Sequence, residues 1–165
     1  MEQNALTQSP FAVLTFIAAP ALLTNATSVL AMSTINRMLR TRDRMSQLYT
    51  RSERMTPEEA NAQRLIAQVN RVEGQGVLLL KALHSIYLAL AAFISATLVT
   101  LLGAGLAPVG GVLWLRILAG IGLALGFVGV SSVVLGCVRL FRATQLSLQN
   151  IREEADLIRE RQTPK

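Results

Sequence analysis

Three long windows of the sequence contain no Asp, Glu, Lys or Arg, and they constrain the fold more than any other feature. They cover residues 3–36, 82–115 and 117–138, which are 34, 34 and 22 residues long. A helix that crosses the roughly 30 Å hydrocarbon core of a bilayer needs about 20 apolar residues. Each window can therefore hold one membrane-spanning helix. Charged residues make up 16% of the chain, against about 25% in soluble domains, which argues against a water-soluble globule.

A Gly/Pro cluster separates the second span from the third. Gly103, Gly105, Pro108, Gly110 and Gly111 fall close together, which is typical of a turn. We therefore predict an all-α fold with three transmembrane helices, whose long cytoplasmic extensions form an antiparallel helical hairpin or bundle. The predicted segments are an extracytoplasmic N-terminus at 1–9, transmembrane helices at 10–35, 82–102 and 112–138, an extracytoplasmic connection at 103–111, a cytoplasmic helical hairpin at 36–81 and a cytoplasmic C-terminal helix at 139–165.

The basic residues lie almost entirely on one side of the predicted spans. Nine of the 16 Lys and Arg residues fall between the first and second spans, and six follow the third. Loops that are rich in Lys and Arg stay in the cytoplasm, so we predict an outside N-terminus and a cytoplasmic C-terminus. The first span lacks the basic start of a signal peptide and is predicted to be a retained anchor.

The segments outside the membrane carry apolar residues at helical spacing. Thr56-Pro57-Glu58-Glu59 is a helix-start signal, with Thr at the N-cap and Pro at the first helical position. Two facing stripes joined by a short turn predict an antiparallel coiled-coil hairpin, and a third stripe predicts a C-terminal helix that packs against it. These stripes are Ile35, Met38, Leu39, Met45, Leu48 and Tyr49; Ala62, Leu65, Ile66, Val69, Val72 and Leu79; and Phe141, Leu148, Ile151, Ala155 and Ile158.

The first span has a polar side that contains Thr24, Asn25 and Ser28, and the third span is rich in glycine. The polar residues have two interpretations: they hold neighbouring helices together, as polar groups in membranes commonly do, or they line a solute or ion pathway. Gly122, Gly126, Gly129 and Gly136 present a small face that predicts close helix packing. The partner of this face is another span or a second subunit, which makes a homo-oligomer an expected state.

A basic cluster of Arg37, Arg40, Arg42 and Arg44 directly follows the first span. Basic residues at this position attract anionic head groups, so membrane lipids are predicted partners. Acidic residues are interspersed in the other cytoplasmic segments, a mixture that argues against nucleic-acid binding. With one cysteine, one histidine and no carboxylate in the spans, the sequence offers no catalytic set and no metal or cofactor site, and we expect no enzyme activity.

Short motifs carry a family resemblance. Pro20 in the first span, Asn36-Arg37 and Asp43-Arg44 resemble the pattern of the bacterial membrane family called domain of unknown function 2721. Leu140-Phe141-Arg142-Ala143-Thr144 is similar to that family's closing segment, although Ala143 stands where the family typically has Glu. The resemblance implies a three-span protein of the bacterial inner (plasma) membrane and implies no activity.

The predicted function is that of a self-associating structural or protein-interaction module with a cytoplasmic helical bundle and a possible cytoplasmic protein partner. The alternative is a small oligomeric channel or transporter component that is lined by the polar side of the first span. A third class is lipid sensing through Arg37–Arg44, which predicts binding that weakens with salt.

Overall fold

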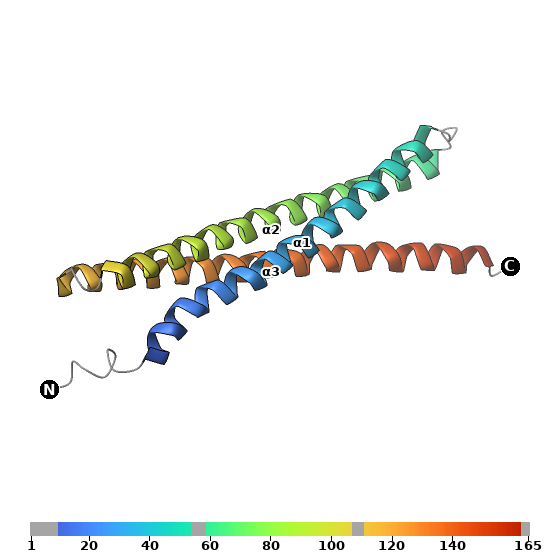
Figure 1. The fold of residues 1–165 in the computed structure, drawn as a ribbon. Helices are drawn as coiled ribbons and strands as arrows, with labels where there is room; N and C mark the ends of the chain where they lie inside the picture. Colours follow the sequence, from blue (N-terminus) through green and yellow to red (C-terminus); the bar gives the residue numbers. More distant parts are fainter. Residues whose placement is uncertain (1–9, 54–58, 107–110, 163–165) are drawn as a thin grey trace. The chain divides into compact units, whose positions relative to one another are not determined.

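The chain forms three long helices in the computed structural model, which describes residues 10–53, 59–106 and 111–162. The helices are α1 (Pro10–Glu53), α2 (Glu59–Leu106) and α3 (Val112–Gln162) (Figure 1). Each of them contains a stretch long and apolar enough to cross a membrane. The prediction of an all-α fold with three such helices is confirmed.

The helix ends differ from the prediction between the second and third spans. Gly103 and Gly105 lie in the last turns of α2, which continues to Leu106, and not in the predicted connection at 103–111. Glycine permits a turn but does not impose one, and a helix satisfies its own backbone hydrogen bonds. The carbonyl of Gly111 accepts a hydrogen bond from the Trp114 amide at 3.0 Å and so begins α3. Thr56, Pro57 and Glu58 of the predicted helix start lie outside the described residues.

The chain divides into two compact units, and each helix contributes one segment to each. Unit 1 comprises residues 1–32 and 85–135, and unit 2 comprises residues 33–84 and 136–165. The predicted membrane boundaries at residues 35, 82 and 138 lie within three residues of these divisions.

Unit 1 is held together by small side chains on facing helices. Along α2, Ala89, Ala92 and Ala96 are buried together with Ile86 and Phe93. These residues recur at helical spacing and form one face. The α3 residues Gly122, Gly129 and Ser132 are also buried. Small residues allow helix backbones to approach closely where apolar burial gives no driving force.

The glycines of unit 1 show how α2 and α3 are aligned. A Cβ added at Gly103 would lie 3.8 Å from the Cβ of Leu118, and one added at Gly122 would lie 3.5 Å from the Cγ2 of Thr100. The third contact is between Gly129 and Phe93, where an added Cβ would lie only 2.5 Å from the ring carbon Cε1. The contacts move toward the start of α2 as they move toward the end of α3, so the two helices are antiparallel.

Unit 2 has its own small core, in which α1, α2 and α3 all take part. Thr34, Val72, Leu79, Ala82 and Ala143 are buried. A guanidinium nitrogen of Arg37, Nη1, donates a hydrogen bond to Thr144 Oγ1 at 3.2 Å and connects α1 to α3. Arg139 Nη1 donates to the carbonyl oxygen of Lys81 at 2.9 Å and connects α3 to α2. The α1 and α2 segments of this unit run side by side, which supports the predicted hairpin (Figure 1).

The predicted packing of the C-terminal stripe is wrong where the structure describes its side chains. Phe141, Leu148 and Ile151 are 66%, 51% and 53% exposed. Ala143 is buried in their place, because its small side chain lets α3 approach the rest of unit 2 along a different face. The side chains of Ala155 and Ile158 lie outside the described residues. On the hairpin, Val72 and Leu79 of the predicted stripe are buried, whereas Leu39, Tyr49 and Ile66 are exposed.

We predict that Gly129→Ala destabilises unit 1 by about 1–3 kcal/mol, the usual cost of overpacking a core. The added methyl group would overlap the ring of Phe93, which is only 1% exposed and has little room to move. Gly126→Ala is the matched control, because an added Cβ there meets nothing within 4 Å. Thermal unfolding in detergent checks both variants, and equal melting temperatures for the two would contradict the prediction.

Candidate functional site

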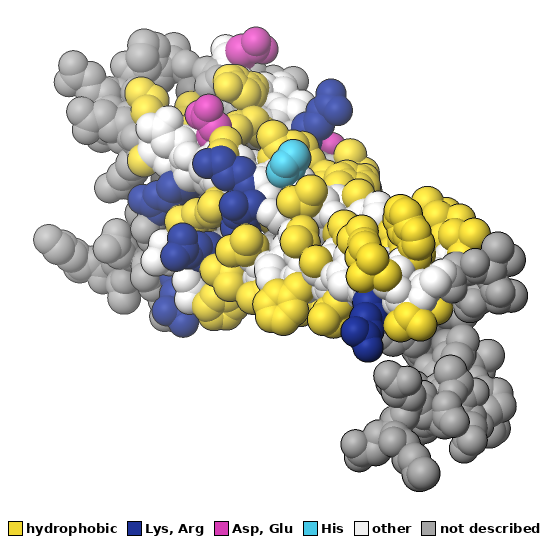
Figure 2. All heavy atoms as spheres, turned by 90° about the vertical axis from the view of Figure 1, so that its left-hand side faces the viewer, with side chains coloured by type: hydrophobic (Ala, Val, Ile, Leu, Met, Phe, Trp, Pro, Cys, Tyr) yellow, Lys and Arg dark blue, Asp and Glu magenta, His cyan; other side chains and the backbone are white. Residues whose placement is uncertain are grey.

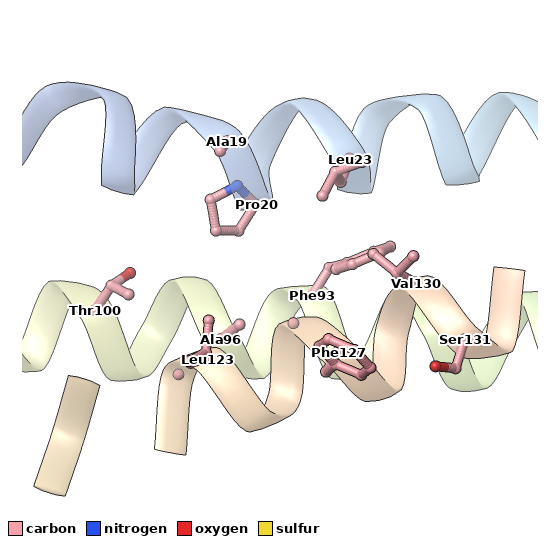
Figure 3. Close-up of a pocket in the computed structure, with 12 residues that line it drawn as sticks. Ala19, Pro20, Leu23, Phe93, Ala96, Thr100, Leu123, Phe127, Val130 and Ser131 are labelled. Atoms are coloured by element: carbon pink, nitrogen blue, oxygen red, sulfur yellow. The ribbon is translucent and has the colours of Figure 1, made fainter. Parts of the chain in front are cut away.

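An apolar cavity of about 620 Å³ lies in unit 1 between its three helical segments (Figure 3). In this view Pro20 and Leu23 of α1 face the side chains of α2 and α3 across the space. The lining residues are Ala19, Pro20, Leu23, Phe93, Ala96, Thr100, Gly122, Leu123, Gly126, Phe127, Val130 and Ser131.

The chemistry of this cavity is that of hydrocarbon. Among the described lining residues, Thr100 and Ser131 carry side-chain hydroxyls, and the Thr100 hydroxyl donates a hydrogen bond to the carbonyl of Thr97 at 2.8 Å. The described residues of the lining are almost all apolar and include no ionisable side chain. These walls therefore fit an apolar ligand or hydrocarbon chain.

The predicted pathway residues of α1 do not line this cavity. Thr24 is half-buried, and its hydroxyl donates to the carbonyl of Pro20 at 2.8 Å. Ser28 is exposed and donates to the carbonyl of Thr24 at 2.9 Å, while Asn25 is exposed. Thr27, which belongs to the same polar side of the first span, is buried and donates to the carbonyl of Leu23 at 2.6 Å. These hydroxyls therefore satisfy the backbone of their own helix.

The four predicted packing glycines fall in different environments. Gly122 contacts Thr100, and Gly129 lies under the ring of Phe93. Gly136 is buried in unit 2. Gly126 is half-buried and borders the cavity. Phe93 is the residue that sequence reasoning missed, and its signal was a single large side chain in the alanine-rich face of α2.

The predicted basic cluster lies on α1 in unit 2. Arg37, Arg40 and Arg42 are exposed, and Arg44 is half-buried. The structure adds basic residues from the other helices, because Arg37 is bonded to α3 and Arg139 of α3 is bonded to α2. Arg139 and Arg37 are far apart in the sequence, and spacing alone gives no sign that they belong to the same unit.

A second hollow, of about 400 Å³, lies between the α1 and α2 segments of unit 2. Its walls are mostly apolar and include Met38, Met45 and Leu80, with Arg42 and Glu73 also in the lining. Within the described part of the chain, no group of three His, Cys, Asp or Glu side chains is placed to hold a metal ion.

Three long apolar helices with hydroxyls turned onto their own backbone are typical of multi-pass membrane proteins. The model of the family described as "Protein of unknown function (DUF2721)" matches residues 17–153. The chain belongs to this family, which confirms the resemblance drawn from its motifs. No curated protein and no solved structure matches the chain significantly.

We predict that the free energy of unfolding of the double variant Thr24→Val/Ser28→Ala lies within about 1 kcal/mol of the wild-type value, because hydroxyls bonded to their own helix contribute little to packing. Thermal unfolding in detergent measures the difference. A larger loss would mean that these hydroxyls are needed by another helix or by a polar pathway.

Proposed function

We propose that the protein is a three-span component of the bacterial inner membrane that works as a self-associating interaction module. Its N-terminus lies outside and its C-terminus in the cytoplasm. The distribution of basic residues supports this orientation, because 15 of the 16 Lys and Arg residues lie between the first and second spans or after the third, and Arg116 lies near the start of the third span. Unit 2 is then the cytoplasmic part.

The observation that carries the proposal is the exposed apolar seam of α3. Phe141, Leu148 and Ile151 are each more than half exposed, although they lie beyond the predicted third span. Large apolar side chains gathered on a surface in water mark interaction sites. In unit 2 such a surface is expected to be covered by protein.

The spacing of the seam favours a second copy of the same helix. The residues follow a seven-residue repeat in which apolar side chains occupy the first and fourth positions, with Thr144 as the exception. This is the pattern of a coiled coil. The seam consists of Phe141, Thr144, Leu148, Ile151, Ala155 and Ile158.

The charges that flank the seam also fit a parallel pair. Glu154 and Arg159 occupy the two flanking positions that meet between parallel coiled-coil helices. In a pair of identical α3 helices, each Glu154 would therefore be opposite the Arg159 of the second copy. An opposite-charge pair at these positions specifies partner and orientation.

The hydrogen bonds of α1 support a packing role over a conducting one. The hydroxyls of Thr24 and Ser28 are engaged with their own backbone. A permeation path lined by this helix needs polar groups that face the permeating solute.

We predict that Arg116→Cys, made in a Cys137→Ala background, reacts with a membrane-impermeant maleimide added to intact cells. Gln145→Cys in the same background should react only after the cells are permeabilised, because residue 145 belongs to the proposed cytoplasmic part. Gel-shift detection of the label reads both outcomes. The reverse pattern would overturn the orientation.

We predict that Leu148→Asp/Ile151→Asp converts an oligomer to a monomer, because it places two carboxylates in the seam. Gln149→Asp/Asn150→Asp is the matched control, since it adds the same two charges on the same turn of α3 but outside the seam. Size-exclusion chromatography with light scattering in detergent measures the mass of the assembly. If the wild type is a monomer, or if both variants dissociate equally, the seam is not the site of self-association.

A further inference from the structure

We propose that unit 2 binds the phosphodiester of an anionic phospholipid through a basic collar, which we define as Arg37, Arg40, Lys81, Arg139 and Arg142. The inference rests on the proposed membrane location but is independent of self-association through α3. It goes beyond the predicted cluster on α1, because the collar draws on all three helices.

The collar residues lie in three stretches of the sequence that lack acidic side chains. The surrounding stretches, residues 33–42, 74–84 and 136–152, contain no Asp or Glu. The nearest acidic residues in the sequence, such as Asp43 and Glu73, lie directly outside these stretches. Figure 2 shows several Lys and Arg side chains gathered in one area of the face that it presents, with Asp and Glu side chains toward the edge of that area. A patch that carries several positive charges favours an anionic ligand.

Hydrogen bonds between the helices hold two of these guanidinium groups in place. Arg37 donates to the hydroxyl of Thr144, and that hydroxyl donates to the carbonyl of Leu140 at 2.9 Å. Arg139 donates to the carbonyl of Lys81. Both acceptors are uncharged oxygens, and the two bonds orient the guanidinium groups. Arginine, with its planar fork of five N–H donors, is well suited to bind phosphate oxygens.

The surroundings of the collar favour a lipid over a free anion. Leu80 and Val138 are exposed and are the sequence neighbours of Lys81 and Arg139. A ligand that contacts both sets of residues needs a phosphate and a hydrocarbon part. Basic residues beside a membrane span attract anionic lipids, and the bonds between helices give this collar a defined geometry.

The test uses the full-length protein in a neutral detergent and native mass spectrometry. Dioleoylphosphatidylglycerol is expected to bind at least tenfold more tightly than dioleoylphosphatidylcholine. Arg37→Gln/Arg142→Gln should weaken phosphatidylglycerol binding by about fivefold for each charge removed, with phosphatidylcholine binding unchanged. Arg116→Gln/Arg152→Gln is the matched control, since it removes two charges outside the collar, and it should bind like the wild type.

Three outcomes would overturn the collar. Equal affinity of the wild type for the two lipids would show that the head group is not recognised. Equal weakening in both double variants would show that only net charge matters. Full competition by millimolar inorganic phosphate would identify a free anion as the ligand. Arg142→Gln alone, at an exposed position, keeps the test decisive if the double variant fails to fold. The same spectra report the oligomeric state, so failure of the self-association proposal is read separately.

Discussion

The structure depends on one constraint, which is that the three apolar stretches carry no charge with which to interact with water. In a hydrocarbon solvent an unsatisfied peptide group costs several kcal/mol, so a chain of this kind is committed to helices. The hydroxyls of Thr24, Thr27 and Ser28 follow the same rule, because each is bonded to a carbonyl of its own helix. These hydroxyl groups are therefore satisfied within α1, and the packing of α1 on the other helices depends on the shapes of its apolar side chains.

The helix pairs of unit 1 differ in how closely their side chains allow them to approach. Between α2 and α3, alanine and glycine faces bring the backbones close, and Phe93 fills the space over Gly129. Between these two helices and α1, the apolar cavity intervenes. Lipid competes for apolar surface as well as another helix does, so close contact depends on small residues on both partners. The glycines of α3 and the alanines of α2 supply such a match.

The sequence was sufficient for the three helices and the family, because charge-free length and short motifs are local properties. It placed the end of α2 too early, since the glycines at 103 and 105 are compatible with either a helix or a turn. It could not give the neighbours of Phe141 or Arg37, because spacing defines a face of a helix and does not say what the face contacts. The contact between Phe93 and Gly129 depends on the alignment of two helices, which no single segment encodes. The predicted roles of Thr24, Asn25 and Ser28 and of the arginine cluster remain predictions.

The ring of Phe93 seated over Gly129 has a mechanical consequence. A bulky side chain packed on a glycine opposes sliding of the two helices in one direction, since a shift of the ring by one turn toward the end of α3 would bring it against the side chain of Ser132. Within unit 1, α1 is therefore expected to shift more easily than α2 and α3, because the apolar cavity separates it from them.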